Sequence, residues 1–290
     1  LLNRWCLFRV MTLLPDPFYR DEAVTVYHAD APEILPLLAD RSVDMVLCDP
    51  PYGCSNAAGD LRASRSFDCL IGSQVREIGN DNQPEADSLY RFILTQSKRL
   101  LATGAACCVC CGGGGPEPRF AEWTLLMRDI LGFKMCVIWD KERPGIGWHY
   151  RRTWECILVS ETNKWNGGLT TRNIIHMPGL RYGVNHHPTE KPLELMKFFI
   201  GLHSNPGELI LDPCAGSGAT LVAAKQMGRR AIGIELEEKF CDLAVRSLAQ
   251  SVFEFERYAF QQGECDPQLA MFESVASGTD DAARAQRDRN

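Results

Sequence analysis

The 290-residue sequence contains no apolar run near the roughly 18 residues that a membrane-spanning helix needs. Residues 1–10 precede the first methionine, Met11, and carry Arg4 and Arg9. They lack the long apolar core and the small-residue cleavage site of a secretion signal. We therefore expect a soluble, cytoplasmic protein in which residues 1–10 form an upstream extension.

The sequence also lacks a disulfide framework, because its 13 cysteines are odd in number and irregularly spaced. This pattern is typical of reduced thiols in the cytoplasm. A zinc site needs four converging ligands, but the run GAACCVCCGGGG reads as a buried strand whose alternate side chains point to opposite faces. We predict core cysteines and no metal site at four positions: Cys107, Cys108, Cys110 and Cys111.

The formal net charge of −6 argues against a nonspecific polybasic binder. The charge is unevenly distributed, however. Between Asp140 and Lys191 there are eight lysines or arginines against five acidic residues. The middle of the chain is therefore locally basic.

Strand-like and helix-like runs alternate along the chain, which is typical of a parallel-rich α/β sheet with helices on both faces. We predict one such domain over residues 11–262. Two polar, glycine-rich stretches interrupt the alternation, Cys54 to Pro84 and Glu161 to Pro188, and we expect both to be functional loops. Residues 263–290 have few periodic apolar positions, which predicts a disordered tail.

A glycine-rich turn follows the predicted strand ELILD, in the run LDPCAGSGAT. It joins Asp212 to a helix, and a second strand ends at Glu235, placed to accept hydrogen bonds from ribose hydroxyls. The turn lacks the GK[ST] ending of a phosphate loop and the third glycine of a dinucleotide fingerprint. An acid at its mouth suits a cationic nucleotide-like ligand such as S-adenosylmethionine, and Gly216 and Gly218 let backbone approach the ligand. An ordinary strand-to-helix turn is the alternative.

The run VDMVLCDPPYG ends a buried strand in an acid, two prolines and an aromatic residue. In an open α/β sheet, Asp49 and Tyr52 then project into the ligand crevice. The prolines end the strand, and the carbonyl of Pro50 stays free to accept hydrogen bonds. Acceptors beside a flat ring predict a pocket for the exocyclic amine of adenine or cytosine; a Pro-Pro turn without chemistry is the alternative.

Three motifs, in this order, resemble the amino-group DNA methyltransferases of the beta-ordered branch: DPPYG at 49–53, HPTEKP at 187–192 and LDPCAGSGAT at 211–220. The resemblance covers about Phe18 to Ala249, and the opening residues resemble phage- or prophage-encoded members. It implies a Rossmann-like methyltransferase fold, S-adenosylmethionine as cofactor and double-stranded DNA as partner. A restriction–modification role and a homodimer stay open.

The resemblance also implies site residues, carried over position by position. The implied catalytic pocket consists of Asp49, Pro50, Pro51 and Tyr52. The residues implied near the cofactor are Asp30, Asp49, Lys191, Pro192, Asp212, Cys214, Gly216, Gly218 and Glu235. Asp30 is alternatively a helix N-cap. Thr189, Lys191 and Pro192 belong to a motif whose helix packs across the methionine end of the cofactor. The family usually has Phe where this chain has Cys214, which bears on cofactor packing.

Target recognition is expected at about residues 140–188, with residues 54–84 as a second, mobile DNA-facing loop. The run KERPGIGWHYRRTWE interleaves aromatic and basic residues, and we expect Arg151 and Arg152 to contact DNA. Solvated arginines are the alternative, and Trp154 is expected to begin a buried strand. For His186 and His187, contact with DNA and no contact with DNA are equally expected.

These features predict an amino-group DNA methyltransferase that acts on a flipped base, and the resemblance of DPPY favours the N6 amine of adenine. Cytosine-N4 methylation by the same pocket is the nearest alternative, because both bases carry an exocyclic amine. A catalytically inactive DNA-binding relic requires broken motifs, and both motifs are intact. A nicotinamide-dependent oxidoreductase is disfavoured by the missing third glycine.

Overall fold

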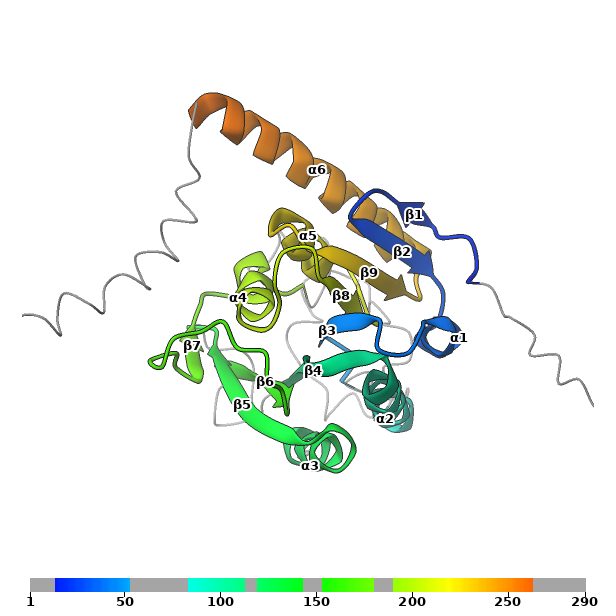
Figure 1. The fold of residues 1–290 in the computed structure, drawn as a ribbon, viewed down its shortest axis with the longest axis vertical. Helices are drawn as coiled ribbons and strands as arrows, with labels where there is room; N and C mark the ends of the chain where they lie inside the picture. Colours follow the sequence, from blue (N-terminus) through cyan, green and yellow to red (C-terminus); the bar gives the residue numbers. More distant parts are fainter. Residues whose placement is uncertain (1–13, 53–82, 113–118, 143–152, 180–189, 263–290) are drawn as a thin grey trace, which may run out of the picture.

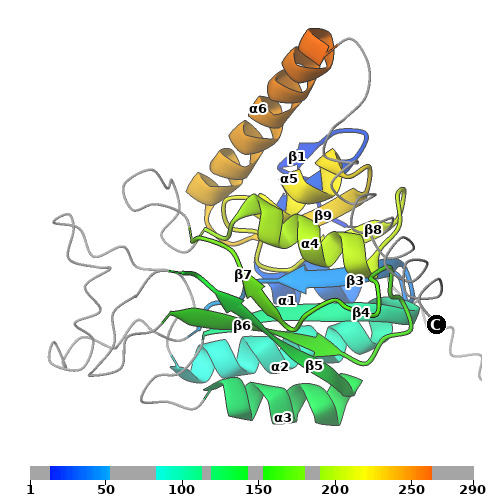
Figure 2. The same cartoon turned by 90° about the vertical axis from the view of Figure 1, so that its left-hand side faces the viewer.

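The computed structural model describes residues 14–52, 83–112, 119–142, 153–179 and 190–262. Within these ranges, a nine-stranded sheet carries helices on both faces, as Figures 1 and 2 show. The predicted α/β fold class is confirmed. None of the helices in the described ranges is long and apolar enough to cross a membrane.

The helices and strands follow the alternation expected from the sequence. The strands are β1 (Tyr19–Arg20), β2 (Val24–His28), β3 (Val43–Cys48), β4 (Leu101–Gly112), β5 (Phe133–Asp140), β6 (Trp154–Ser160), β7 (Ile174–His176), β8 (Leu209–Asp212) and β9 (Arg230–Glu235). The helices are α1 (Ala31–Ile34) with the 3-10 turn η1 (Leu35–Leu37), α2 (Gln83–Leu100), α3 (Arg119–Leu131), α4 (Leu193–His203), α5 (Ala219–Gln226) and α6 (Glu238–Gln262).

The strand order in the sheet is β1-β2-β9-β8-β3-β4-β6-β5-β7. Of these described strands, β1 and β6 run against the other seven. The carboxyl ends of β9, β8, β3, β4 and β5 therefore meet at one edge, together with the amino end of β6. In α/β sheets this edge is where ligands bind.

Both faces of the sheet are buried, which explains why β3 is an almost continuous apolar run. One core cluster packs the sheet against α4, α5 and α6, and the other packs it against α1, α2 and α3. The cysteines of β4 divide between them, with Cys108 and Cys110 in the first cluster and Cys107 and Cys111 in the second. The predicted alternation of buried cysteines is confirmed.

Two elements depart from the boundaries expected from sequence. The loop predicted as far as Pro84 ends earlier, because α2 begins at Gln83 and a helix tolerates proline in its first turn. The stretch 161–188, expected to be a loop, contains the short strand β7, which pairs with β5.

The amino edge of the sheet, opposite the DPPY turn, is tied together by ionic contacts. The Lys164 ammonium lies 3.2 Å from a carboxylate oxygen of Asp44 on β3 and 2.7 Å from one of Glu208, just before β8. Asp44 also accepts a hydrogen bond from the backbone N–H of Leu209, at 3.0 Å. These contacts fix β3 and β8 side by side at their amino ends.

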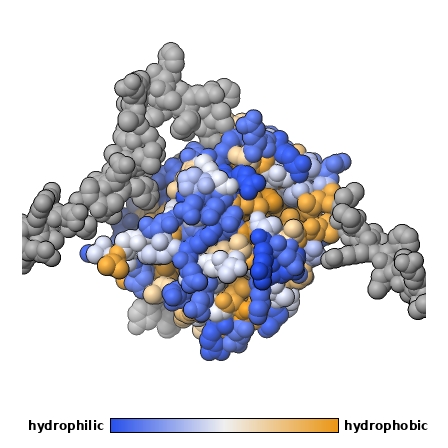
Figure 3. Space-filling model, in the orientation of Figure 1, coloured by the Kyte–Doolittle hydropathy of each residue, from blue (hydrophilic) through white to orange (hydrophobic). Residues whose placement is uncertain are grey.

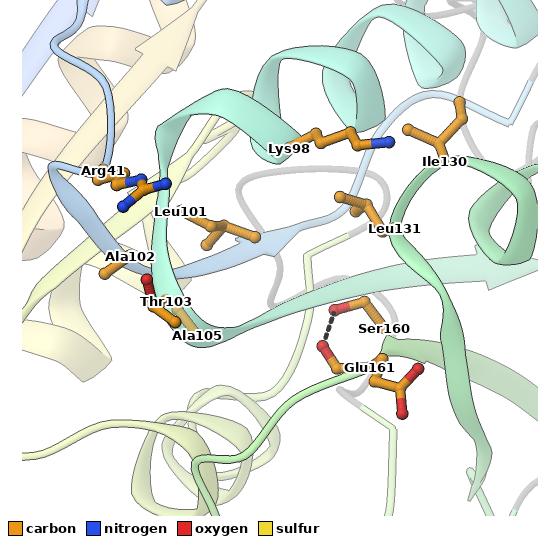
Figure 4. A pocket seen from close by; sticks show the side chains of 10 residues that line it. All are labelled: Arg41, Lys98, Leu101, Ala102, Thr103, Ala105, Ile130, Leu131, Ser160 and Glu161. Carbon is orange, nitrogen blue, oxygen red and sulfur yellow. Dashed lines mark hydrogen bonds between the residues drawn. The ribbon is translucent and has the colours of Figure 1, made fainter.

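A hollow of about 290 Å³ also lies at this amino edge, between the start of β4 and the end of β6 (Figure 4). Arg41 and Glu161 are among its lining residues. A six-residue strand spans roughly 20 Å, so this hollow is separated from the DPPY turn by the full length of β3. On the face shown in Figure 3, the surface is mostly hydrophilic, with apolar residues in small groups.

Candidate active site

The DPPY turn and the glycine-rich turn leave neighbouring strands of the sheet. β3 and β8 pair in parallel, with Met45 opposite Ile210 and Val46 opposite Leu211. Asp49 follows the end of β3, and Asp212 is the last residue of β8. Two motifs that are far apart in the sequence therefore meet at one edge of the sheet.

Asp49 is held from two sides. The Tyr52 hydroxyl donates a hydrogen bond to its Oδ1 at 2.5 Å, and the Lys191 ammonium donates to its Oδ2 at 2.6 Å. Pro50 is buried, and Pro51 and Tyr52 are half-buried. The predicted catalytic residues are thus together at the carboxyl edge, and the carboxylate has a fixed orientation.

The Tyr52 ring is seated against the end of β4 and against α3. A Cβ added to Gly112 would lie 3.2 Å from the ring, so a glycine there leaves room for the tyrosine. On another side, Trp123 meets the ring edge-on, with centroids 6.2 Å apart. Tyr90 stacks on Trp123 in turn, at 4.1 Å. Tyr52 therefore stands on a packed aromatic support.

Lys191 contacts Asp49, which belongs to the predicted catalytic pocket. Besides its bond to Asp49, its ammonium lies 3.4 Å from Oε2 of Glu155 and 5.4 Å from the centroid of the Tyr52 ring. Oε1 of Glu155 accepts a hydrogen bond from Lys141 at 3.0 Å. Oε2 of Glu155 is buried and accepts no hydrogen bond from the described residues. Charges of alternating sign thus run from Asp49 through Lys191 and Glu155 to Lys141.

Neither Glu155 nor Lys141 belongs to a sequence motif that predicts a site residue. Glu155 is the second residue of β6, which runs antiparallel to β4 and places Glu155 opposite Gly112 at the carboxyl edge. A charged residue at the start of an otherwise buried strand was the available signal. Using it requires knowing that β6 is reversed in the sheet.

Burial and the neighbouring charges set the ionisation of these groups. Burial raises the pKa of Asp49, although Lys191 opposes the shift. Burial also acts to raise the pKa of Glu155, but Lys191 and Lys141 outweigh it and hold that pKa below its usual value. For Lys191, burial opposes the cation, yet the two carboxylates raise its pKa and keep it charged.

The predicted cofactor residues gather around the glycine-rich turn. Asp212 is buried and accepts a hydrogen bond from the backbone N–H of Cys214, at 3.1 Å. Glu235 accepts backbone hydrogen bonds from Gly216, at 2.8 Å, and from Glu237, at 2.9 Å. The tip of β9 therefore shapes the turn directly. Carboxylate oxygens have further lone pairs, so Glu235 can still accept from a ligand.

Gly218, expected from the sequence to let backbone approach the ligand, is also constrained by the fold itself. It is the N-cap of α5, with a φ of 85°. An added Cβ would lie 2.8 Å from the Cβ and 3.0 Å from the Cα of Ala244 in α6. The missing side chain of Gly218 therefore permits a left-handed backbone and close packing against α6.

The remaining predicted residues lie around the same edge or outside the described ranges. Asp30 is at the N-cap position of α1, but its side chain makes no capping hydrogen bond there. The backbone N–H of the preceding Ala29 donates to the carbonyl of Glu235, at 3.0 Å, which brings Asp30 beside the tip of β9. Pro192 is buried at the N-cap of α4. Positions outside the described ranges are Arg151, Arg152, His186, His187, Thr189, and most of 54–84.

The chain is similar to known DNA-modifying enzymes. The family described as DNA methylase matches residues 169–246. "DNA adenine methyltransferase YhdJ" of Escherichia coli is 26% identical over 267 residues, covering 79% of this chain and 84% of that protein. "Type II methyltransferase M2.DpnII" of Streptococcus pneumoniae is 26% identical over 261 residues, covering 81% of this chain and 93% of that protein.

Solved structures share the fold. The protein TTHA0409 of Thermus thermophilus, complexed with S-adenosyl-L-methionine, is 25% identical with a TM-score of 0.56, covering 78% of this chain and 93% of that one. The cytosine-N4-specific PvuII DNA methyltransferase is 17% identical with a TM-score of 0.59, covering 80% of this chain and 95% of that one. This chain therefore shares its fold with a structure named as cytosine-N4-specific.

Replacing Gly218 by alanine should destabilise the protein more than the same change at Gly228. Both glycines have positive φ, which costs a side-chain-bearing residue about 1 kcal/mol or more, but a Cβ on Gly228 meets nothing within 4 Å. We expect Gly228→Ala to lower the melting temperature by roughly 2 to 4 °C and Gly218→Ala by clearly more. Calorimetry of the two variants checks this, and equal losses would contradict the contact with Ala244.

Asp212 should make the stability depend on pH. Burial raises the pKa of Asp212 to about 7 from 3.8, so the unfolded state loses this proton at a lower pH than the folded state. Between about pH 4 and pH 7, rising pH therefore favours unfolding. We expect Asp212→Asn to gain free energy of unfolding relative to wild type across this interval, by about 4 kcal/mol at most. Urea titrations at several pH values measure the difference, and a pH-independent difference would refute the raised pKa.

Proposed function

We propose that this chain, an amino-group DNA methyltransferase that uses S-adenosylmethionine, methylates the N6 amine of adenine in double-stranded DNA. The observation that carries the proposal is the pairing of β3 with β8, which puts Asp49 beside the glycine-rich turn that begins after Asp212. A target amine and a methyl donor bound at these two turns would be neighbours. The names of the adenine-modifying relatives support adenine as the base.

The residues around the glycine-rich turn fit this cofactor. When bound, S-adenosylmethionine supplies an electrophilic methyl group on a positively charged sulfur. Asp212 is a buried acid at the mouth of the turn, and Asp49 lies on the neighbouring strand. Two acids suit a cationic ligand. Glu235 and Asp30, at the tip of the next strand and just beyond it, are suited to the polar end of a nucleoside.

Asp49 has the role of accepting hydrogen bonds from the target amine, together with the carbonyl of Pro50. An aromatic amine is a poor nucleophile, because its lone pair is delocalised into the ring. Acceptors on its hydrogens draw the nitrogen toward a tetrahedral geometry and direct the lone pair at the methyl group. Both oxygens of Asp49 already accept from Tyr52 and Lys191, and their remaining lone pairs are available to the amine.

Tyr52 provides the stacking surface for the base. Its ring is half-buried and backed edge-on by Trp123, so it is held in place before a base arrives. A base in duplex DNA must leave the helix to reach this pocket, at a cost of a few kcal/mol that stacking and hydrogen bonds offset. Arg151 and Arg152, outside the described residues, are the proposed contacts to the DNA backbone.

Replacing Asp49 by asparagine should abolish most methyl transfer but leave the binding of S-adenosylhomocysteine, which has no charge on its sulfur, largely intact. The variant keeps the shape of the side chain but loses the charged acceptor, which typically costs 10²–10³ in rate. We expect the affinity for S-adenosylhomocysteine, measured by calorimetry, to change by only a few fold. Asp44→Asn is the matched control, because Asp44 lies on the same strand at the opposite edge. Full activity of Asp49→Asn would remove Asp49 from the mechanism.

The modified base is identified by expressing the chain in a methylation-deficient host. Nucleoside mass spectrometry of the DNA should show N6-methyladenine, and single-molecule sequencing should place it at a short specific sequence. N4-methylcytosine as the sole new nucleoside would overturn the assignment to adenine. Assays on matched single- and double-stranded oligonucleotides test the duplex requirement, and light scattering of the purified chain tests whether it forms a homodimer.

A further inference from the structure

Lys191 occupies a position that the cofactor role expected from its motif does not explain. Its side chain is only 6% exposed, and its ammonium bonds to Asp49 at 2.6 Å. It contacts Glu155 at 3.4 Å and lies over the Tyr52 ring at 5.4 Å. All three neighbours belong to the proposed amine pocket or to its wall. These contacts place the cation at the proposed amine pocket.

The pocket needs a cation because it concentrates acids in a poorly solvated place. Asp49 and Glu155 are each about one-fifth exposed, and both contact the same ammonium. Two carboxylates that share a site cannot both ionise readily unless a cation compensates them. A protonated Asp49 would offer a weaker acceptor to the amine. Replacing Lys191 would therefore favour the protonated form of Asp49 and weaken it as an acceptor, although Asp49 itself is unchanged.

Glu155 anchors the cation from the far side. Its Oε1 is fixed by Lys141 at 3.0 Å, and its Oε2 faces Lys191 without a hydrogen bond from the described residues. The register of β6 on β4 sets Glu155 opposite Gly112, whose missing side chain makes room for Tyr52. Lys191 is thereby held between two carboxylates. Moving its ammonium away from Asp49 would also break its contact with Glu155.

We infer that Lys191 is a positioning residue of the methyl transfer: its ammonium keeps Asp49 ionised and aims Oδ2, while Glu155 anchors that ammonium. This inference rests on the proposed role of Asp49 as the acceptor for the target amine. Tyr52 holds the other oxygen, so the plane of the carboxylate is fixed by two donors. Lys191 acts through Asp49.

Other titratable groups also face Asp49 and contribute to its ionisation. Besides Tyr52, Lys191 and Glu155, they are Cys48 on β3, Cys110 on β4, Asp212 on β8 and Cys214 after β8. Burial raises the pKa of each of these three thiols, although Cys48 opposes the shift at Cys214, so the thiols stay neutral. Among these groups Lys191 supplies the positive charge.

The first test is the pH dependence of single-turnover methyl transfer by the full chain. Lys191→Met removes the charge but keeps much of the side-chain length. We expect the acidic limb of the profile to move up by about 1 to 3 pH units, because loss of a close cation raises the pKa of Asp49. Activity at low pH should fall accordingly and recover as the pH rises. Lys191→Arg, which keeps the charge, should restore most of the profile.

Lys164→Met is the matched control. Lys164 also bridges two carboxylates, Asp44 and Glu208, and it ties together the same two strands at the opposite edge. It should lower the melting temperature and leave the pH profile at the wild-type position. A pH-independent loss in Lys191→Met would make Lys191 merely structural. If Lys191→Met binds S-adenosylhomocysteine more weakly and its pH profile stays at the wild-type position, Lys191 acts in cofactor binding instead. Either result overturns the inference.

The double variant Lys191→Met, Glu155→Gln tests the anchor. Without the ammonium, Glu155 is a competing negative charge beside Asp49, so neutralising it should recover part of the lost activity near neutral pH. We expect the acidic limb of the double variant to lie between those of wild type and Lys191→Met. If the acidic limb of the double variant lies at the same pH as that of Lys191→Met or higher, Glu155 does not act on Asp49, and its role in the inference is wrong.

A measurement without DNA separates this inference from the proposed function. In protein carrying ¹³C-labelled aspartate, the Asp49 carboxyl signal, assigned through Asp49→Asn, titrates with its protonation. Lys191→Met should shift this titration to higher pH even if the wild-type chain methylates no DNA. Absence of methylated DNA with the shift present would refute the proposed function alone. An unshifted titration would refute the role of Lys191 alone.

Discussion

The parallel pairing of β3 and β8 is the contact on which the site depends. It is fixed at the amino edge by Lys164 between Asp44 and Glu208, and in the interior by apolar strands buried on both faces. At the carboxyl edge the same pairing sets Asp49 beside Asp212. A slip of the register by one residue would turn the side chains of the shifted strand to the opposite face of the sheet. The chemistry at one edge is thus secured by contacts at the other.

The sequence predicted what depends on short-range patterns. Apolar strands ending in DPPY and in LDPCAGSG located both turns, because motif and strand end are contiguous in the chain. The alternation of cysteines in β4 was readable for the same reason, since a strand sends successive side chains to opposite faces. The family match, the relatives and the solved structures agree with the fold and the chemistry drawn from these motifs.

The surroundings of Asp49 depended on pairings that short-range patterns do not encode. The motif around Lys191 suggested a place near the cofactor, but it gave no sign that the residues before α4 bring Lys191 into contact with Asp49. Glu155 joins the site only because β6 runs against β4 and so begins where β4 ends. The role of Gly218 was also hidden, since its neighbour Ala244 comes from a later helix. Each of these facts requires the assembled sheet.

The packing of Gly218 on Ala244 joins the glycine-rich turn to α6, which contributes none of the residues named in the site. Any side chain larger than alanine at position 244 would press on the turn from behind. Position 244 should therefore tolerate only small residues. A redesign of α6 that enlarged the side chain at position 244 would disturb the glycine-rich turn without changing any residue of the pocket.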